Sequence, residues 1–144
     1  MVTFTSGDMF SVAADARVNT VNCVGVMGAG VALAFRQRYP AMFRDYAAAC
    51  SRGEVRPGKL HVWSDGDIEV LNMPTKRHYR NPSTYEDVEA GLVALREYLG
   101  SRKMRVTLPA PGCGCGGLDW KRVSGLVEIH LGDIEAEILA FSPR

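Results

Sequence analysis

Apolar and polar positions alternate along this chain with two periods, one typical of strands and one typical of helices. Short alternating or β-branched runs predict strands at residues 2–5, 16–21, 59–63, 68–73, 105–108 and 133–141. Apolar residues at helical spacing predict helices at residues 31–39, 40–53, 83–99 and 119–131. Pro40 separates the first two helices because proline cannot continue a helix but suits the first turn of a new one.

The order of these elements predicts the fold class. Strands alternate with helices over most of the chain, and the turn at residues 64–67 predicts a hairpin between two of the strands. This pattern is typical of an α/β protein, so we expect a three-layer α/β/α sandwich around a central mixed β-sheet. With 144 residues and no linker or repeat, residues 1–144 are expected to form a single domain.

Composition narrows the function classes. The formal net charge is only +1, which does not favour a global polybasic surface for nucleic acid or membranes. The N-terminus lacks the pattern of a signal peptide, and no apolar stretch approaches the ~20 residues of a membrane span, so a cytoplasmic location is expected. The four cysteines and three histidines have no zinc-ligand spacing, so we expect reduced thiols and no metal.

Two glycine clusters each follow a predicted strand. Residues 18–31 pass from a β-branched run through Gly25, Gly28 and Gly30 into a helix, and residues 109–117 form the second cluster. A strand that joins a helix through glycines brings backbone N–H groups to the positive end of the helix, which suits a phosphate or diphosphate. Neither cluster has the dinucleotide or P-loop fingerprint. The alternative is that these glycines only form tight turns, but two clusters at one sheet edge favour a shared ligand.

A basic loop follows the predicted strand at residues 68–73. Lys76 lies there among Arg77, His78 and Arg80. Neighbouring positive charge and partial burial favour the neutral amine, which can attack an electrophilic carbon and form a Schiff base with a sugar aldehyde. Arg77, His78, Tyr79 and Arg80 also suit a nucleic-acid contact, with arginines on phosphates and a base on the tyrosine ring. A solvated basic loop is the alternative.

Single polar residues complete the candidate site. Asp8 ends the first predicted strand and can accept a hydrogen bond from an adenine amine, or simply form a turn. Asn19 and Asn22 lie on or beside an apolar strand, where buried amides require partners. Asn22 stands closer to the glycine turn and is the stronger candidate for a ligand contact. A cysteine nucleophile at Cys113 or Cys115 has no evident histidine and acid to support it.

Three motifs in order resemble macrodomains of the DarG antitoxin branch and their eukaryotic relative, the terminal ADP-ribose protein glycohydrolase. The first is the stretch at residues 18–31, Val-Asn-Thr-Val-Asn-Cys-Val-Gly-Val-Met-Gly-Ala-Gly-Val. The second is Asn72-Met73-Pro74-Thr75-Lys76-Arg77-His78-Tyr79-Arg80, and the third is Gly112-Cys113-Gly114-Cys115-Gly116-Gly117-Leu118-Asp119-Trp120. The resemblance runs from Val2 to the last predicted strand.

The resemblance implies a hydrolase that removes ADP-ribose from a modified target, through Lys76 as the catalytic residue. It implies that ADP-ribose is ligand and product, that no other cofactor takes part, and that Asn22 contacts the distal ribose. Asp8 and Met9 would hold the adenine, and two further segments would cradle the diphosphate and ribose. The full set of expected ADP-ribose contacts is Asp8, Met9, Asn19, Asn22, Val26, Met27, Gly28, Ala29, Gly30, Val31, Thr75, Pro111, Gly112, Cys113, Gly114, Cys115 and Gly116.

The target distinguishes the two branches. In the DarG branch it is a thymine base of DNA, and in the eukaryotic relative it is an acidic protein side chain. The eukaryotic relative has an aspartate in its second loop that helps release the lysine adduct, whereas this chain has Gly116, as the DarG branch does. We therefore expect single-stranded DNA that carries thymidine-linked ADP-ribose as the substrate. The resemblance to the DarG branch also implies a cognate ADP-ribosyltransferase toxin as a partner. The protein is expected to be a monomer. The alternatives are a hydrolase for protein-linked ADP-ribose, a non-catalytic ADP-ribose-binding module, or a phosphatase acting on ADP-ribose phosphate.

Overall fold

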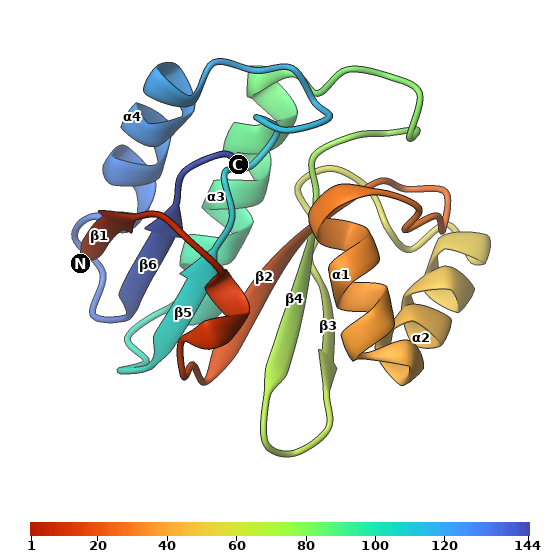
Figure 1. Ribbon diagram of the computed structural model, residues 1–144, viewed down its shortest axis with the longest axis horizontal. Coiled ribbons are helices and arrows are strands. Elements are labelled where there is room, and N and C mark those ends of the chain that lie inside the picture. The colour runs from red at the N-terminus through yellow and green to blue at the C-terminus, as the bar shows by residue number, and fades with distance from the viewer.

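The computed structural model describes residues 1–144 and contains one six-stranded sheet (Figure 1). Its strands, in sheet order, are β1 (Val2–Thr5), β6 (Glu137–Phe141), β5 (Arg105–Leu108), β2 (Ala16–Val21), β4 (Glu69–Pro74) and β3 (His61–Ser64). All neighbouring strands are parallel except β3, which pairs with β4 in an antiparallel hairpin. The sheet is therefore mixed, as the sequence predicts.

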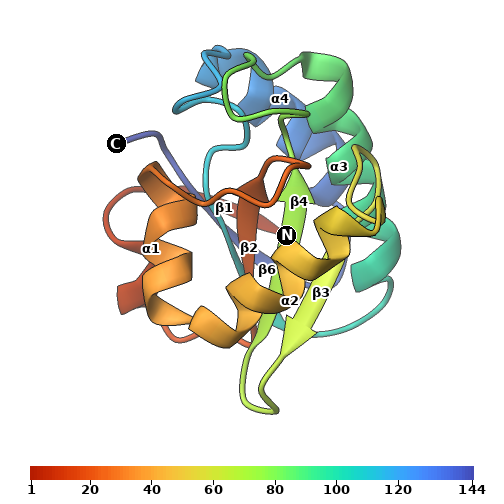
Figure 2. The same cartoon turned by 90° about the vertical axis from the view of Figure 1, so that its right-hand side faces the viewer.

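Helices cover both faces of this sheet (Figures 1 and 2). Two of them, α1 (Gly30–Arg38) and α2 (Pro40–Ser51), lie on one face together with the short 3-10 helix η1 (Met9–Ser11). The other two, α3 (Tyr85–Leu99) and α4 (Trp120–Leu131), lie on the opposite face. This arrangement confirms the expected three-layer α/β/α sandwich. None of the helices combines the length and the apolar character that crossing a membrane requires.

Each face of the sheet has its own apolar core. Val18 of β2 belongs to the cluster under α3 and α4, whereas Val21 of the same strand belongs to the cluster under α1 and α2. Strand β2 is buried along almost its whole length, because side chains on a strand alternate between faces and both faces here are covered. Burial of β2 and β4 fixes the middle of the sheet, and the first glycine loop and the basic loop follow the carboxyl ends of these two strands.

Most element boundaries lie within two residues of the sequence prediction, and the start of the last strand differs most. The last strand was expected from Asp133 but begins at Glu137, because residues 132–136 form a turn in which Asp133 pairs with Arg96. The N-terminal amino group donates to the carbonyl of Ile134 at 2.7 Å, which holds this turn against β1. Alternating apolar residues occur in both the turn and the strand, so periodicity alone could not separate them.

Two helical glycines differ in the space around them, which allows a matched test of the core. A Cβ on Gly91 of α3 would lie 2.7 Å from Met73 Cγ, whereas a Cβ on Gly125 of α4 would meet nothing within 4 Å. We expect Gly91→Ala to lower the free energy of unfolding by about 1–3 kcal/mol through overpacking. Gly125→Ala should raise it by up to about 1 kcal/mol through helix propensity. Urea denaturation measures both, and equal stabilisation by the two substitutions would contradict the packing of Met73 against α3.

Candidate active site

Hydrogen bonds continue the pairing of β2 with β4 beyond the ends of both strands. The ladder runs to Val21 opposite Pro74, and the Val21 carbonyl then accepts from the N–H groups of Thr75 at 2.9 Å and Lys76 at 3.4 Å. One step further, the Cys23 N–H donates to the Arg77 carbonyl at 3.3 Å. The backbone of Lys76 is therefore fixed beside the start of the first glycine loop.

Asn22 holds that loop in shape with its side-chain amide. Its Nδ2 donates to the Val26 carbonyl at 2.8 Å, and its Oδ1 accepts from the Val24 N–H at 3.1 Å. The Tyr46 hydroxyl lies 2.9 Å from the same Oδ1 and 2.8 Å from the Asn22 carbonyl. Burial raises the pKa of Tyr46 strongly, so this hydroxyl stays protonated and remains a donor. Asn22 thus lies at the site, while its ribose contact stays a prediction.

Asn19 lies one layer deeper, fully buried beneath Met27. Its Nδ2 is 3.0 Å from Asn72 Oδ1 and 3.8 Å from the Met27 sulfur, while its own Oδ1 has no partner. The Asn72 amide continues to His61 at 2.9 Å, and His61 continues to Asp45 at 2.8 Å. This chain of polar groups runs from the surface of α2 to the underside of the first glycine loop. It gives Asn19 a supporting role for Met27, and a direct ligand contact stays a prediction.

The first glycine loop leads into an uncapped helix N-terminus. Gly30 opens α1 with a φ of +59°, a left-handed conformation that glycine adopts without strain. Ala29 stands at the N-cap position, and no side chain accepts from the first N–H groups of α1. These N–H groups can therefore donate to an anion, which the helix dipole also favours.

The second glycine loop, residues 109–117, packs tightly against the start of α3. A Cβ on Gly116 would lie 2.3 Å from Ser83 Oγ and 2.4 Å from the Gly112 carbonyl oxygen, so only glycine fits there without a shift. The Gly116 carbonyl accepts from the Ser83 N–H at 3.1 Å, and the Gly112 carbonyl accepts from the Leu118 N–H at 2.9 Å. Close packing thus explains in physical terms why no aspartate stands at Gly116.

The two glycine loops meet at the N-terminus of α1. A Cβ on Gly30 would lie 3.9 Å from Cys115 Sγ, although the two residues are far apart in the sequence. The proximity of the loops agrees with the sequence expectation that both face one site. Which of the residues Val26, Met27, Gly28, Ala29, Val31, Pro111, Cys113 and Gly114 contact a ligand stays a prediction.

The basic loop after β4 is partly engaged within the protein. The Arg77 guanidinium pairs with Asp87 of α3 through Nε at 3.2 Å and Nη2 at 3.3 Å, and this hydrogen bonding raises the pKa of Arg77. Half-buried Lys76 places its Nζ 3.4 Å from the Tyr79 carbonyl. The rings of His78 and Tyr79 stack with centroids 4.2 Å apart, and Tyr79 is 43% exposed. A nucleic-acid contact of this loop stays a prediction, with Tyr79 and Arg80 the groups that remain free for it.

Arg17 is a supporting residue that the sequence reading missed. Its guanidinium is buried without an acidic partner and donates to the carbonyls of Met9 at 2.6 Å and Val12 at 2.7 Å. It thereby fixes η1, where Asp8 accepts from the Phe10 N–H through Oδ1 at 2.9 Å and keeps its second oxygen free. An arginine within an otherwise apolar strand was the available signal, because a buried cation needs several acceptors.

The thiols near the site are poor nucleophiles at neutral pH. Burial is the main cause that raises the pKa of Cys23 and of Cys113 to about 11 each, and in Cys113 the charge of Asp119 adds to it. Both thiols therefore stay protonated at neutral pH. No three histidine, cysteine, aspartate or glutamate side chains gather as a group that could hold a metal ion. Lys76 lies beside the start of the first glycine loop, and its role as the nucleophile stays a prediction.

Comparison with known proteins places this chain in a family. A family model for the macro domain matches residues 18–127. The chain therefore belongs to the macrodomain family. Within it, the chain resembles the macrodomain of Thermus aquaticus DarG, which superposes with a TM-score of 0.92 at 37% identity and covers 98% of this chain and 97% of that one.

Longer relatives share the same region. A DNA ADP-ribosyl glycohydrolase of Mycobacterium tuberculosis is 46% identical over 128 residues, which are 85% of this chain and 36% of the relative. The structure of Thermosipho africanus DarTG in complex with ADP-ribose superposes with a TM-score of 0.90 at 30% identity, over 99% of this chain and 41% of that one. This chain thus spans about two fifths or less of the length of these two relatives.

Gly116 and Gly114 allow a matched test of the second glycine loop. We expect Gly116→Ala to lower the free energy of unfolding by about 1–3 kcal/mol, because the new methyl group would overlap Ser83 and the Gly112 carbonyl. A Cβ on Gly114 would meet nothing within 4 Å, so Gly114→Ala should change stability by no more than about 0.5 kcal/mol. Chemical denaturation checks both values. A neutral Gly116→Ala would disprove the close approach of this loop to Ser83.

The pH dependence of cysteine alkylation tests the burial of thiols in both glycine loops. At pH 8 iodoacetamide should modify exposed Cys115 first, and it should reach Cys23 and Cys113 slowly because their thiols are protonated. Modification of Cys23 and Cys113 should accelerate as the pH rises towards 11. Peptide mass spectrometry after timed labelling measures each site. Fast labelling of Cys113 at pH 8 would contradict its burial.

Proposed function

We propose that this macrodomain is a hydrolase whose substrate is single-stranded DNA with ADP-ribose linked to a thymidine. The enzyme removes the ADP-ribose and restores the unmodified base. The observation that carries the proposal is the combination of 46% identity to a DNA ADP-ribosyl glycohydrolase with Lys76 held beside the first glycine loop, which meets the second at Gly30. The fit of the Thermosipho africanus protein, whose structure contains ADP-ribose, supports the same ligand here. No further cofactor is part of the proposal.

The proposed ligand matches the chemistry around the two loops. The diphosphate lies at the N-terminus of α1, where uncapped N–H groups and the helix dipole stabilise negative charge. The adenine lies against Met9 and donates to the free oxygen of Asp8, in the segment that Arg17 fixes. The distal ribose then lies towards Asn22 and Lys76, which the extended β2–β4 pairing holds together.

Lys76 supplies the nucleophile in the proposed reaction. Its neutral amine attacks the anomeric carbon of the distal ribose, the carbon–nitrogen bond to the base breaks, and the base leaves with a proton. The second amine proton then moves to the ring oxygen as the bond between this oxygen and the anomeric carbon breaks, which opens the sugar ring and gives an imine between Lys76 and the ribose carbon. Water hydrolyses this imine, which releases ADP-ribose and restores the amine. No aspartate at position 116 assists this last step, because Gly116 has no space for a side chain.

The proposed partner is a cognate ADP-ribosyltransferase that supplies the modified DNA. A Thermosipho africanus relative, 30% identical over 99% of this chain, is a fusion of a DNA ADP-ribosyl transferase with a DNA ADP-ribosyl glycohydrolase. We therefore propose that this macrodomain acts as an antitoxin against such a transferase, as a monomer in the cytoplasm.

Substitutions of Lys76 test the proposal directly. Lys76→Arg keeps the positive charge but has no neutral amine, so it should lower release of ADP-ribose from a modified oligonucleotide by at least about 100-fold. Lys76→Ala should have the same effect, whereas Lys103→Ala, at an exposed lysine elsewhere, should leave the rate unchanged. Chromatography of released ADP-ribose measures turnover, and calorimetry should show that Lys76→Arg still binds ADP-ribose.

Chemical trapping examines the covalent step separately. Borohydride reduces an imine to a stable amine, so wild-type protein treated during turnover should gain the mass of ADP-ribose less one oxygen atom on Lys76. Lys76→Arg should gain no such adduct. Full activity of Lys76→Arg would overturn the role of this residue. Turnover only on aspartate- or glutamate-linked ADP-ribose would replace DNA by protein as the substrate. Binding of ADP-ribose without any turnover would instead define a binding module.

A further inference from the structure

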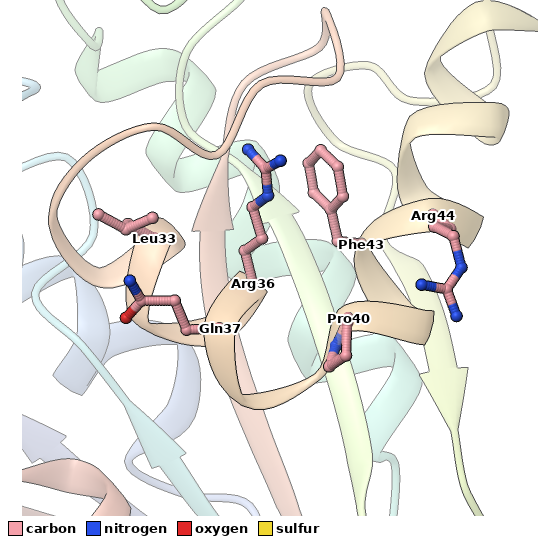
Figure 3. A pocket seen from close by; sticks show the side chains of 6 residues that line it. All are labelled: Leu33, Arg36, Gln37, Pro40, Phe43 and Arg44. Atoms are coloured by element: carbon pink, nitrogen blue, oxygen red, sulfur yellow. The ribbon is translucent and has the colours of Figure 1, made fainter.

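A basic depression lies between α1 and α2, outside the two glycine loops (Figure 3). It measures about 530 Å³ and is lined by Leu33, Arg36, Gln37, Pro40, Phe43 and Arg44. The Arg36 guanidinium lies 4.2 Å from the centre of the Phe43 ring, and both side chains point towards the loop that precedes α1 (Figure 3). None of these residues belongs to the site described above.

Positive charge is concentrated on this pair of helices. Residues 30–51 contain three arginines and one acid, whereas the whole chain has a formal net charge of only +1. The single acid, Asp45, is bound to His61, and none of Arg36, Arg38 and Arg44 takes part in an ion pair. All three arginines are exposed. The face therefore carries uncompensated positive charge that a polyanion can neutralise.

The contact with Phe43 prepares Arg36 for a nucleic acid. A guanidinium that lies over an aromatic ring keeps its N–H edges available, and its planar fork matches a phosphate. The same guanidinium plane and the half-buried Phe43 ring form a surface on which a base can stack. An acidic protein surface would use the charges but not the flat surface, so the combination favours nucleic acid.

The depression lies within reach of the proposed ADP-ribose site. Helix α1 starts at Gly30, where the two glycine loops meet, and Arg36 follows six residues later, about 9 Å along the helix axis. The loop between β2 and α1 passes over the ends of both helices (Figure 2) and exposes Val24 and Val26. A strand that leaves the ADP-ribose site across this loop can therefore extend towards Arg36.

We propose that the α1–α2 depression binds the single-stranded DNA that flanks the modified base. Arg36 and Arg44 contact phosphates, and the Arg36–Phe43 pair contacts one base. This inference rests on the proposed function, since it assigns the path of the substrate strand beyond the ADP-ribose site.

Strand binding can be measured without turnover. Fluorescence anisotropy with labelled, unmodified oligothymidine should show that Arg36→Glu/Arg44→Glu weakens binding by about 10-fold or more at low salt. The slope of log affinity against log salt concentration should become less steep by about 1.4, since each lost phosphate contact contributes about 0.7. Phe43→Leu should weaken binding with the salt slope unchanged, because stacking releases no counterions.

The matched control reverses two charges on another face. Arg102 lies 4.6 Å from the Tyr98 ring and forms an arginine–aromatic pair like that of Arg36, with Lys103 beside it. Arg102→Glu/Lys103→Glu should leave affinity for oligothymidine within about 2-fold of wild type and the salt slope unchanged. An equal loss in both double variants would show a general charge effect and overturn the proposal.

Two further measurements separate this inference from the proposed function. Arg36→Glu/Arg44→Glu should bind free ADP-ribose as wild type does, and with a long modified strand it should raise KM while kcat stays unchanged. If wild-type protein shows no DNA turnover but its strand binding depends on Arg36 and Arg44, only the catalytic proposal fails. Unchanged KM and salt slope would overturn the binding surface. So would displacement of the oligonucleotide by polyglutamate of equal charge at the same concentration, which would identify an acidic protein as the occupant.

Discussion

The parallel pairing of β2 with β4 is the constraint on which the candidate site depends. Within the sheet this pairing is ordinary, but the bonds from the Val21 carbonyl to Thr75 and Lys76, and from Cys23 to Arg77, extend it beyond both strands. Loops at the end of a sheet are usually its most mobile part. Here the extension binds the two loops to each other, so the backbone of Lys76 and the first glycine loop form one hydrogen-bonded unit.

Buried polar groups give this unit its second layer of support. Leaving such a group unsatisfied costs about 1–3 kcal/mol, so amides inside a core persist where they hold something in place. Asn19 and Asn72 link Met27, under the first glycine loop, to His61 of β3 and Asp45 of α2. Tyr46 of α2 supports Asn22 through a hydrogen bond, and Arg17 supports η1 in the same way. Hydrogen bonds within the protein thus hold the site in shape from three separate elements.

The sequence predicted the layers, the glycine loops and the place of Lys76, because periodicity and glycine spacing are local properties of the chain. It could not predict Tyr46, Arg17 or Ser83 as supports, because their partners lie in segments distant in sequence and only the fold brings them together. The sequence itself shows glycine instead of aspartate at position 116. The physical reason, close contact with Ser83 and the Gly112 carbonyl, is visible only in the folded structure. Residues 133–136 were predicted as strand but lie in a turn, because both conformations tolerate the same alternation of apolar and polar residues.

Charge placement explains why the proposed substrate strand needs more than the loop after β4. In that loop Arg77 is neutralised by Asp87, the His78 ring accepts from the Arg80 N–H, and Lys76 is assigned to the chemistry. Only Tyr79 and the Arg80 side chain remain for a phosphodiester chain, and one cation releases few counterions. The uncompensated arginines of α1 and α2 lie on the other side of the first glycine loop, so a strand held at both places would cross the site between them. A single loop would position the sugar, whereas arginine contacts to phosphates on opposite sides would also orient the base that leaves.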